Sequence, residues 1–166
     1  MIVLGIDPGL ANTGYGVVAN RGGRLVALDG GVIETAAGLA VERRLTLIFS
    51  RVRELLDEHD CAAMALEQLY FGQNANSAFA VGQARGVTML AAGEREVPCF
   101  SYTPQQVKSA VCGHGRAAKD QVARMVQTLL ALPPQPMPDH ASDALAVAIC
   151  HTNRAPLRAA MVGATA

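Results

Sequence analysis

The N-terminal part of the chain has the short apolar segments of a β-sheet. Residues 2–7 are apolar and β-branched, and Asp7-Pro8-Gly9 ends this segment with turn residues. Two further apolar segments, residues 14–19 and 25–35, flank Asn20-Arg21-Gly22-Gly23, which has the composition of a hairpin turn. The pattern predicts three strands joined by tight turns.

The hydrophobic period then changes to that of an amphipathic helix. Within residues 40–59, apolar residues recur at helical spacing and charged residues occupy the other face. Residues 61–66 form a continuous apolar run that ends at Glu67, which is typical of a parallel strand buried on both faces. Residues 75–93 are rich in Ala and Gly and predict a closely packed helix, and residues 97–102 predict a short strand.

The C-terminal part has the signals of three further helices. Thr103-Pro104-Gln105-Gln106 starts the first, with Thr as the N-cap and Gln three residues later. After a break at Gly113-His114-Gly115, a second helix is expected over residues 117–130, and the third from a cap at Asp139 to about residue 153. We therefore expect one α/β domain over residues 1–153, with a five-stranded mixed β-sheet flanked by α-helices, and a frayed, flexible tail over residues 154–166.

The charge balance argues against a protein that binds nucleic acid by bulk basicity alone. The 166 residues include 14 basic and 14 acidic side chains, so the formal net charge is zero. Residues 104–126 are nevertheless locally basic, with Lys108, Arg116, Lys119 and Arg124 against Asp120. The four cysteines form no CxxC pair, and no apolar run is long enough to span a membrane, so we expect a cytoplasmic protein with reduced thiols.

Acidic side chains follow two of the predicted strands and open the last helix. Asp7 ends the first strand and Glu67 ends the later one; if these strands are neighbours, both carboxylates meet at one edge of the sheet. At the start of the last helix, either His140 or Asp139 shares a face with Asp143. An Asp-Pro-Gly sequence is often only a turn, and Asp139 suits a helix cap. A carboxylate directly after a buried strand, however, is costly unless it has a use.

Clustered carboxylates raise one another's pKa unless a cation neutralises them. Hard oxygen ligands suit Mg²⁺ or Mn²⁺, and one imidazole is also compatible with Mn²⁺. Two such ions about 3.5 to 4 Å apart are the usual arrangement for in-line attack on a phosphodiester. The acidic residues therefore indicate a metal-dependent phosphodiesterase.

Five sequence motifs span nearly the whole chain: Leu4-Gly5-Ile6-Asp7-Pro8-Gly9, Leu66-Glu67-Gln68, Gly82-Gln83-Ala84-Arg85-Gly86-Val87, Gln105-Gln106-Val107-Lys108 and His140-Ala141-Ser142-Asp143-Ala144-Leu145-Ala146. In this order they resemble the RuvC family of bacterial Holliday junction resolvases. The resemblance implies an RNase H-like fold and a magnesium-dependent endonuclease. It further implies a homodimer that cuts opposed strands of a four-way DNA junction during recombination and repair and leaves ligatable nicks. The family's branch-migration proteins RuvA and RuvB are implied as partners.

Carried over by position, the resemblance assigns roles to individual residues. The metal-binding and catalytic set is Asp7, Glu67, His140 and Asp143, and the family register favours His140 over the adjacent Asp139. Lysines matching Lys108 and Lys119 handle the DNA backbone. Tyr70 or Phe71 matches an aromatic residue that stacks on an unpaired base. From the residues themselves, Gly113, Gly115 and Arg116 form a loop that can approach phosphates.

Three other interpretations share some of these features. An actin-like ATPase also begins with an apolar strand, Asp and Gly, but it needs two domains, and this chain has room for one. A nuclease acting on RNA–DNA hybrids or ribosomal RNA precursors has the acidic set without needing a symmetric dimer. A non-catalytic DNA-binding module differs in not requiring Mg²⁺ or Mn²⁺.

Overall fold

A computed structural model describes residues 1–68 and 75–163 of the chain. Tyr70 and Phe71 lie outside these residues. In the described part, strands and helices follow one another in the order β1 (Ile2–Asp7), β2 (Asn12–Arg21), β3 (Arg24–Glu34), α1 (Val41–His59), β4 (Ala63–Glu67), α2 (Ala75–Gly93), β5 (Cys99–Tyr102), α3 (Pro104–Cys112), α4 (Lys119–Leu129) and α5 (Asp139–Gly163).

The five strands form one mixed sheet in the order β3-β2-β1-β4-β5. The first three strands are antiparallel neighbours, whereas β4 is parallel to both β1 and β5. The pairing of β1 with β4 places Ile6 opposite Leu66, so the residues that follow each of them reach the same edge. The five-stranded mixed sheet predicted from the sequence is thus confirmed.

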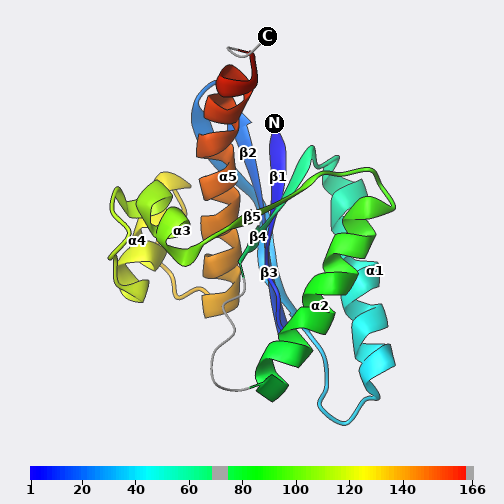
Figure 1. Ribbon diagram of the computed structural model, residues 1–166. Coiled ribbons are helices and arrows are strands. Elements are labelled where there is room, and N and C mark those ends of the chain that lie inside the picture. Colours follow the sequence, from blue (N-terminus) through cyan, green and yellow to red (C-terminus); the bar gives the residue numbers. More distant parts are fainter. Residues whose placement is uncertain (69–74, 164–166) are drawn as a thin grey trace.

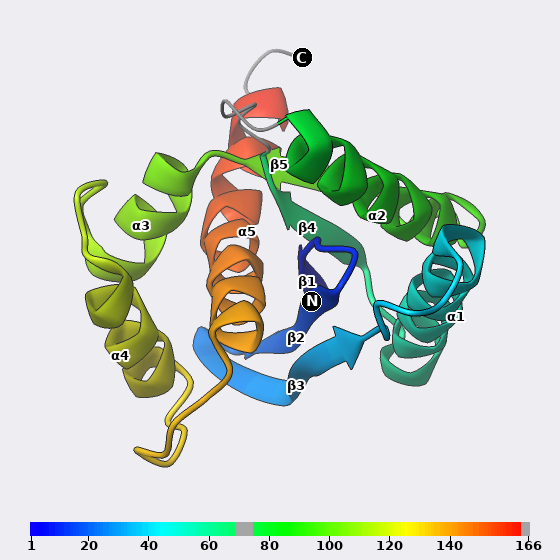
Figure 2. The same ribbon diagram turned by 90° about the horizontal axis from the view of Figure 1, so that it is seen from below.

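Helices cover both faces of the sheet, and each face has its own hydrophobic core. Helix α5 lies along one face with α3 and α4 outside it, and α1 and α2 cover the other face (Figures 1 and 2). Side chains of α5 pack with Val3, Val18 and Tyr102 on the first face. Leu4, Ile6 and Met64 point to the second face, where they pack with side chains of α1 and α2. This alternation follows from the two-residue period of a strand.

Helix α5 packs directly on β1 and β2 because these strands carry glycine at the points of contact. A Cβ atom added to Gly14 would lie 1.9 Å from the carbonyl oxygen of His140, and one added to Gly5 would lie 2.0 Å from that of Ala144. Gly16 faces Leu145 in the same way. Glycine inside a strand often marks such a close backbone approach. The sheet thereby holds the first turns of α5 at backbone-to-backbone distance.

Several local predictions are confirmed, and two helix boundaries differ. The hairpin turns on Gly22 and Gly23 at positive φ, and Thr103 forms a complete capping box with Gln106. Asp139 is the first residue of α5, not its cap, because the amide of Ser142 bonds the carbonyl of Pro138. Helix α5 also continues past Pro156 to Gly163, so the predicted end near residue 153 is wrong. The Arg, Ala, Leu and Met residues on both sides of Pro156 favour helix, although the proline itself does not. Within residues 1–68 and 75–163, no helix has the length and apolar character needed to traverse a membrane.

Candidate active site

The site lies where the carboxyl ends of β1 and β4 meet the first turn of α5. Asp7 is the last residue of β1 and Glu67 the last of β4, and these parallel strands are adjacent. His140 and Asp143 lie one turn apart at the start of α5, which packs on β1 and β2. The chain thus brings together, from three elements, the four residues that the sequence singles out.

Contacts within the site distinguish His140 from Asp139. The Nδ1 atom of His140 lies 2.7 Å from Oδ2 of Asp7, at hydrogen-bond distance. Asp139 is 76% exposed, and its Oδ2 lies 3.1 Å from Nζ of Lys119. The same ammonium group lies 3.3 Å from Oδ2 of Asp143. His140 therefore contacts the strand carboxylate, whereas Asp139 contacts a lysine at the outer side of the turn.

The electrostatics of the site favour an additional cation. Burial, and then the charges of Asp7 and Asp143, raise the pKa of Glu67, against the opposing effect of Lys108 and Lys119. Burial also raises the pKa of Asp143, and Lys119 only partly offsets this. Within the described residues, no Lys or Arg forms an ion pair within 4.0 Å with the carboxylate of Asp7 or of Glu67. Carboxylate oxygens and an imidazole in such a field fit a hard divalent cation.

A cleft extends from these carboxylates between α3, α4 and α5. It is lined by the charged groups of Glu67, Lys108, Lys119 and Asp143 and by a short apolar wall of Pro104, Val107, Val122, Ala146 and Val147. The two lysines come from α3 and from the first residue of α4. The cleft therefore presents positive groups beside the acidic ones, an arrangement suited to a phosphodiester approaching bound metal.

Other sequence-predicted residues lie further out. Arg116 is exposed on the loop between α3, which carries Lys108, and α4, which begins at Lys119. Tyr70 and Phe71, predicted to stack on a base, fall outside the described residues. Their placement therefore stays a prediction.

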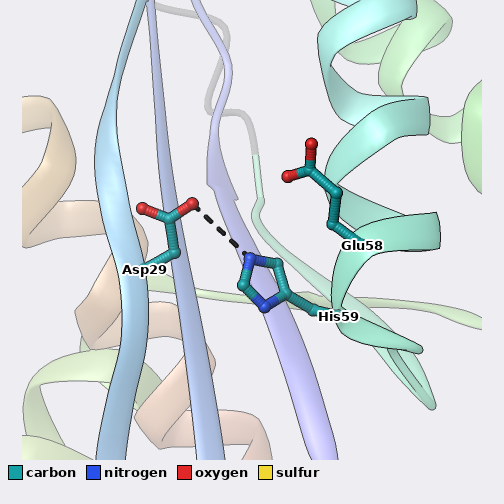
Figure 3. A group of neighbouring side chains, drawn as sticks. All are labelled: Asp29, Glu58 and His59. Atoms are coloured by element: carbon teal, nitrogen blue, oxygen red, sulfur yellow. Dashed lines mark ion pairs between the residues drawn. The ribbon is translucent and has the colours of Figure 1, made fainter.

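A second group of potential metal ligands lies away from this site, between β3 and the end of α1 (Figure 3). Ligand atoms of Asp29, Glu58 and His59 lie within 4.8 Å of one another, a closeness that no three of the Asp7 site residues reach within the part of the chain described here. Arg51 sits among them, 3.3 Å from Glu58 and 3.9 Å from Asp29. Its guanidinium already supplies the compensating positive charge, so this group ties α1 to the sheet.

Two features of the site escaped the sequence analysis. Gly14 and Gly16 let α5 approach β2, and their spacing within a predicted strand is the signal that indicates close backbone contact. The ion pairs of Lys119 with Asp139 and Asp143 have no comparable signal, because their partners are brought together only by the fold.

The chain matches known proteins along nearly its whole length. The family model described as "Crossover junction endodeoxyribonuclease RuvC" matches residues 3–151. The crossover junction endodeoxyribonuclease RuvC of Moorella thermoacetica is 51% identical over 158 residues, covering 95% of both chains. The RuvC protein of Thermomicrobium roseum is also 51% identical, over 91% of this chain and 92% of its own.

The structural comparison agrees with the sequence comparison. RuvC of Thermus thermophilus, solved in complex with a Holliday junction substrate, superimposes with a TM-score of 0.91 at 41% identity, covering 95% of this chain and 96% of that one. The RNase H-like architecture expected from the sequence is therefore confirmed. With the acidic residues of its motifs gathered at one sheet edge, the chain belongs to the RuvC family of crossover junction endodeoxyribonucleases.

Proposed function

We propose that this protein resolves four-way DNA junctions by hydrolysing phosphodiesters in two opposed strands. The observation that carries the proposal is the meeting of Asp7, Glu67, His140 and Asp143 at one sheet edge in a member of the RuvC family. The Thermus thermophilus relative, which binds a Holliday junction substrate, supports the choice of substrate. Such cutting serves recombination and DNA repair.

Asp7, Glu67, His140 and Asp143 are the residues that hold the metal in this proposal. Magnesium suits their oxygen-rich donor set, two ions per subunit suit in-line phosphodiester hydrolysis, and Mn²⁺ is expected to substitute. When bound, the metal activates the attacking water and stabilises the leaving oxygen. His140 is preferred over Asp139 because it contacts Asp7, whereas Asp139 is engaged by Lys119.

The positive groups around the cleft are proposed to bind the DNA backbone. Lys108 and Lys119 line the cleft beside Glu67 and Asp143, where an ammonium suits a phosphate or a developing negative charge. Arg116, on the exposed loop, extends this surface. Tyr70 or Phe71 is proposed to stack on an unpaired base at the junction.

A homodimer is proposed because two sites are needed to cut two opposed strands. Helix α2 offers a surface for it: Phe79 and Leu90 are 70% and 57% exposed. Gly82 and Gly86 fall on the same helical face by their spacing, and a Cβ added to either would meet open space. Large apolar side chains beside bare backbone are suited to close packing against an identical helix.

Two further roles are proposed from membership of the RuvC family. RuvA and RuvB, the branch-migration proteins, are proposed partners at the junction. A cytoplasmic location is also proposed, because the four cysteines of the sequence are scattered and form no CxxC pair.

The deciding experiment incubates the purified protein with a synthetic mobile four-way junction and Mg²⁺. We expect paired nicks at symmetric positions in opposed strands, lost on chelation of the metal and restored by Mn²⁺. An absence of symmetric nicks under dimer-forming conditions, together with cleavage of a plain RNA–DNA hybrid, would assign the chain to another RNase H-like activity. Cutting that survives metal chelation would overturn the metal proposal.

A further inference from the structure

Arg85 of α2 reaches from the second face of the sheet to the backbone of Glu67. Its Nη1 donates to the carbonyl oxygen of Glu67 at 2.8 Å, and its Nη2 donates to Oγ of Ser101 at 2.6 Å. One guanidinium thus joins the end of β4, through Glu67, to the neighbouring strand β5, through Ser101.

The peptide group after Glu67 is held at both of its polar atoms. Its N–H, which belongs to Gln68, donates to the carbonyl oxygen of Tyr102 at 2.7 Å, while its C=O accepts from Arg85. A peptide unit is planar, so holding both atoms fixes the orientation of this plane and restrains the ψ angle of Glu67, the backbone from which its side chain extends. The ladder with β5 provides one restraint, and Arg85 provides the other.

The surroundings of Arg85 indicate that this contact is its main role. Among residues 1–68 and 75–163, no carboxylate forms an ion pair with it. Burial lowers its pKa, the direction expected for a guanidinium taken out of water without a carboxylate partner. A partly buried guanidinium without a carboxylate partner is unfavourable, and its hydrogen bonds to the two neutral acceptors offset part of this unfavourable free energy.

We propose that Arg85 is a positioning residue that holds the Glu67 carboxylate in its metal-binding direction and couples it to α2. This inference rests on the proposed function, in which Glu67 is a metal ligand. The face of α2 that carries Phe79 and Leu90 is exposed, whereas Arg85 lies about a third of a turn away from them, beside the buried Ala84. A contact made by α2 on its outer face is therefore linked, through one side chain, to the active-site carboxylate.

The test measures metal binding directly, by titrating the purified protein with Mn²⁺ and following free Mn²⁺ by electron paramagnetic resonance. Arg85→Ala is expected to weaken Mn²⁺ binding by about 10-fold or more, the usual effect of removing a group that orients a ligand. Ser101→Ala, which removes one of the two acceptors, is expected to weaken it less. Arg85→Lys is expected to restore little, because an ammonium cannot span both acceptors as a planar fork does.

Arg95→Ala provides the matched control. Arg95 follows α2 and also makes a two-bonded contact, with Asp57 of α1 at 2.8 and 2.6 Å, but it lies away from Glu67. Its loss tests the general effect of removing an arginine that ties α2 to the rest of the fold. Thermal unfolding of each variant, measured in parallel, separates loss of stability from loss of metal affinity.

The outcomes are distinguishable. Weaker Mn²⁺ binding in Arg85→Ala with unchanged binding in Arg95→Ala supports the inference, and should Arg85→Ala not fold, a weaker affinity in Ser101→Ala supports it instead. The inference is overturned if Arg85→Ala and Ser101→Ala both bind Mn²⁺ with wild-type affinity. It is also overturned if Arg95→Ala loses as much Mn²⁺ affinity as Arg85→Ala does. If Glu67→Gln itself binds Mn²⁺ and cleaves junctions as the wild type does, then Glu67 is not a ligand, and the proposed function fails at this residue together with the inference.

Discussion

Two groups of acidic and histidine side chains lie on this molecule, and they differ in how their charges are balanced. At the end of α1, Arg51 lies within 4.0 Å of Asp29 and Glu58, so the guanidinium is shared among the acids. At the sheet edge, Glu67 has no such partner among the described residues, and burial and neighbouring acids raise its pKa.

The comparison shows that closeness of ligand atoms is a poor guide to function by itself. The group around Asp29 is the tighter of the two, yet its carboxylates already share the guanidinium of Arg51. The group around Glu67 is looser, but partial burial and neighbouring acids raise the pKa of both Glu67 and Asp143. Unbalanced charge that a fold retains at a cost is the stronger indication of a site that acts on a ligand.

The largest difference between the two groups is expected in cleavage. Glu67→Gln keeps the shape of the side chain but removes a charged ligand, so junction cleavage is expected to fall by about 10³-fold or more. Asp29→Asn is expected to leave the rate unchanged. Single-turnover cleavage of a labelled junction measures both, with junction binding in the absence of metal as the control for folding. A large loss in Asp29→Asn would move the functional group to α1.

The second prediction disturbs the placement of the acidic group without changing its charges. Gly14→Ala forces a Cβ against the backbone of His140, so α5 must shift away from β2. Cleavage is expected to fall by about 100-fold, the effect of a misplacement near 1 Å, with a loss of stability of about 1–3 kcal/mol.

Gly30→Ala is the matched control for this substitution. Gly30 lies on the neighbouring strand, β3, and a Cβ added there would lie 3.6 Å from the side chain of Leu145, which is an ordinary van der Waals contact. Cleavage by this variant is expected to match the wild type. Equal losses in the two variants would mean that the sheet tolerates no alanine there, and that the contact of Gly14 with α5 has no special role.

The third prediction separates the two neighbours at the start of α5. His140→Ala removes the group that contacts Asp7 and is expected to lower cleavage about 10- to 100-fold more than Asp139→Ala does. Both variants are expected to bind junctions, which a mobility-shift assay measures. The reverse ranking would make Asp139 the ligand.

The smallest effects are expected in the stability of the metal-free protein, and they have opposite signs. Folded Glu67 binds its proton more tightly than the unfolded chain does, so its ionised form at neutral pH disfavours folding. Glu67→Gln is therefore expected to raise the free energy of unfolding by about 0.5–2 kcal/mol at pH 7. Asp29→Asn, which weakens a half-exposed charge network, is expected to lower it by about 0–1 kcal/mol.

The pH dependence checks the sign of the Glu67 effect. As pH falls through its raised pKa, the wild-type carboxylate takes up a proton and the penalty disappears, so the advantage of Glu67→Gln should shrink. Urea unfolding of both proteins in chelator, at neutral and mildly acidic pH, measures this difference. An advantage that grows on acidification would contradict the assignment.

Local sequence patterns predict most of the secondary structure, because each depends on a short segment. The capping box at Thr103 and the glycine turn at Gly22 and Gly23 are examples. The meeting of Asp7 with Glu67 also follows from sequence, once their strands are taken as parallel neighbours. The ion pairs of Lys119 and the reach of Arg85 do not, because they join elements whose spacing only the packed fold determines.

The glycine contact between α5 and the sheet has a consequence for how the core of this protein can vary. Where a helix rests on side chains, each change of core residue moves it by the difference in side-chain size. At Gly5 and Gly14 the helix contacts the main chain, whose dimensions do not depend on the side chains around it. The gap between the acid of β1 and the first turn of α5 is thus independent of the surrounding core, which is free to change its composition over evolutionary time while the cutting geometry stays constant.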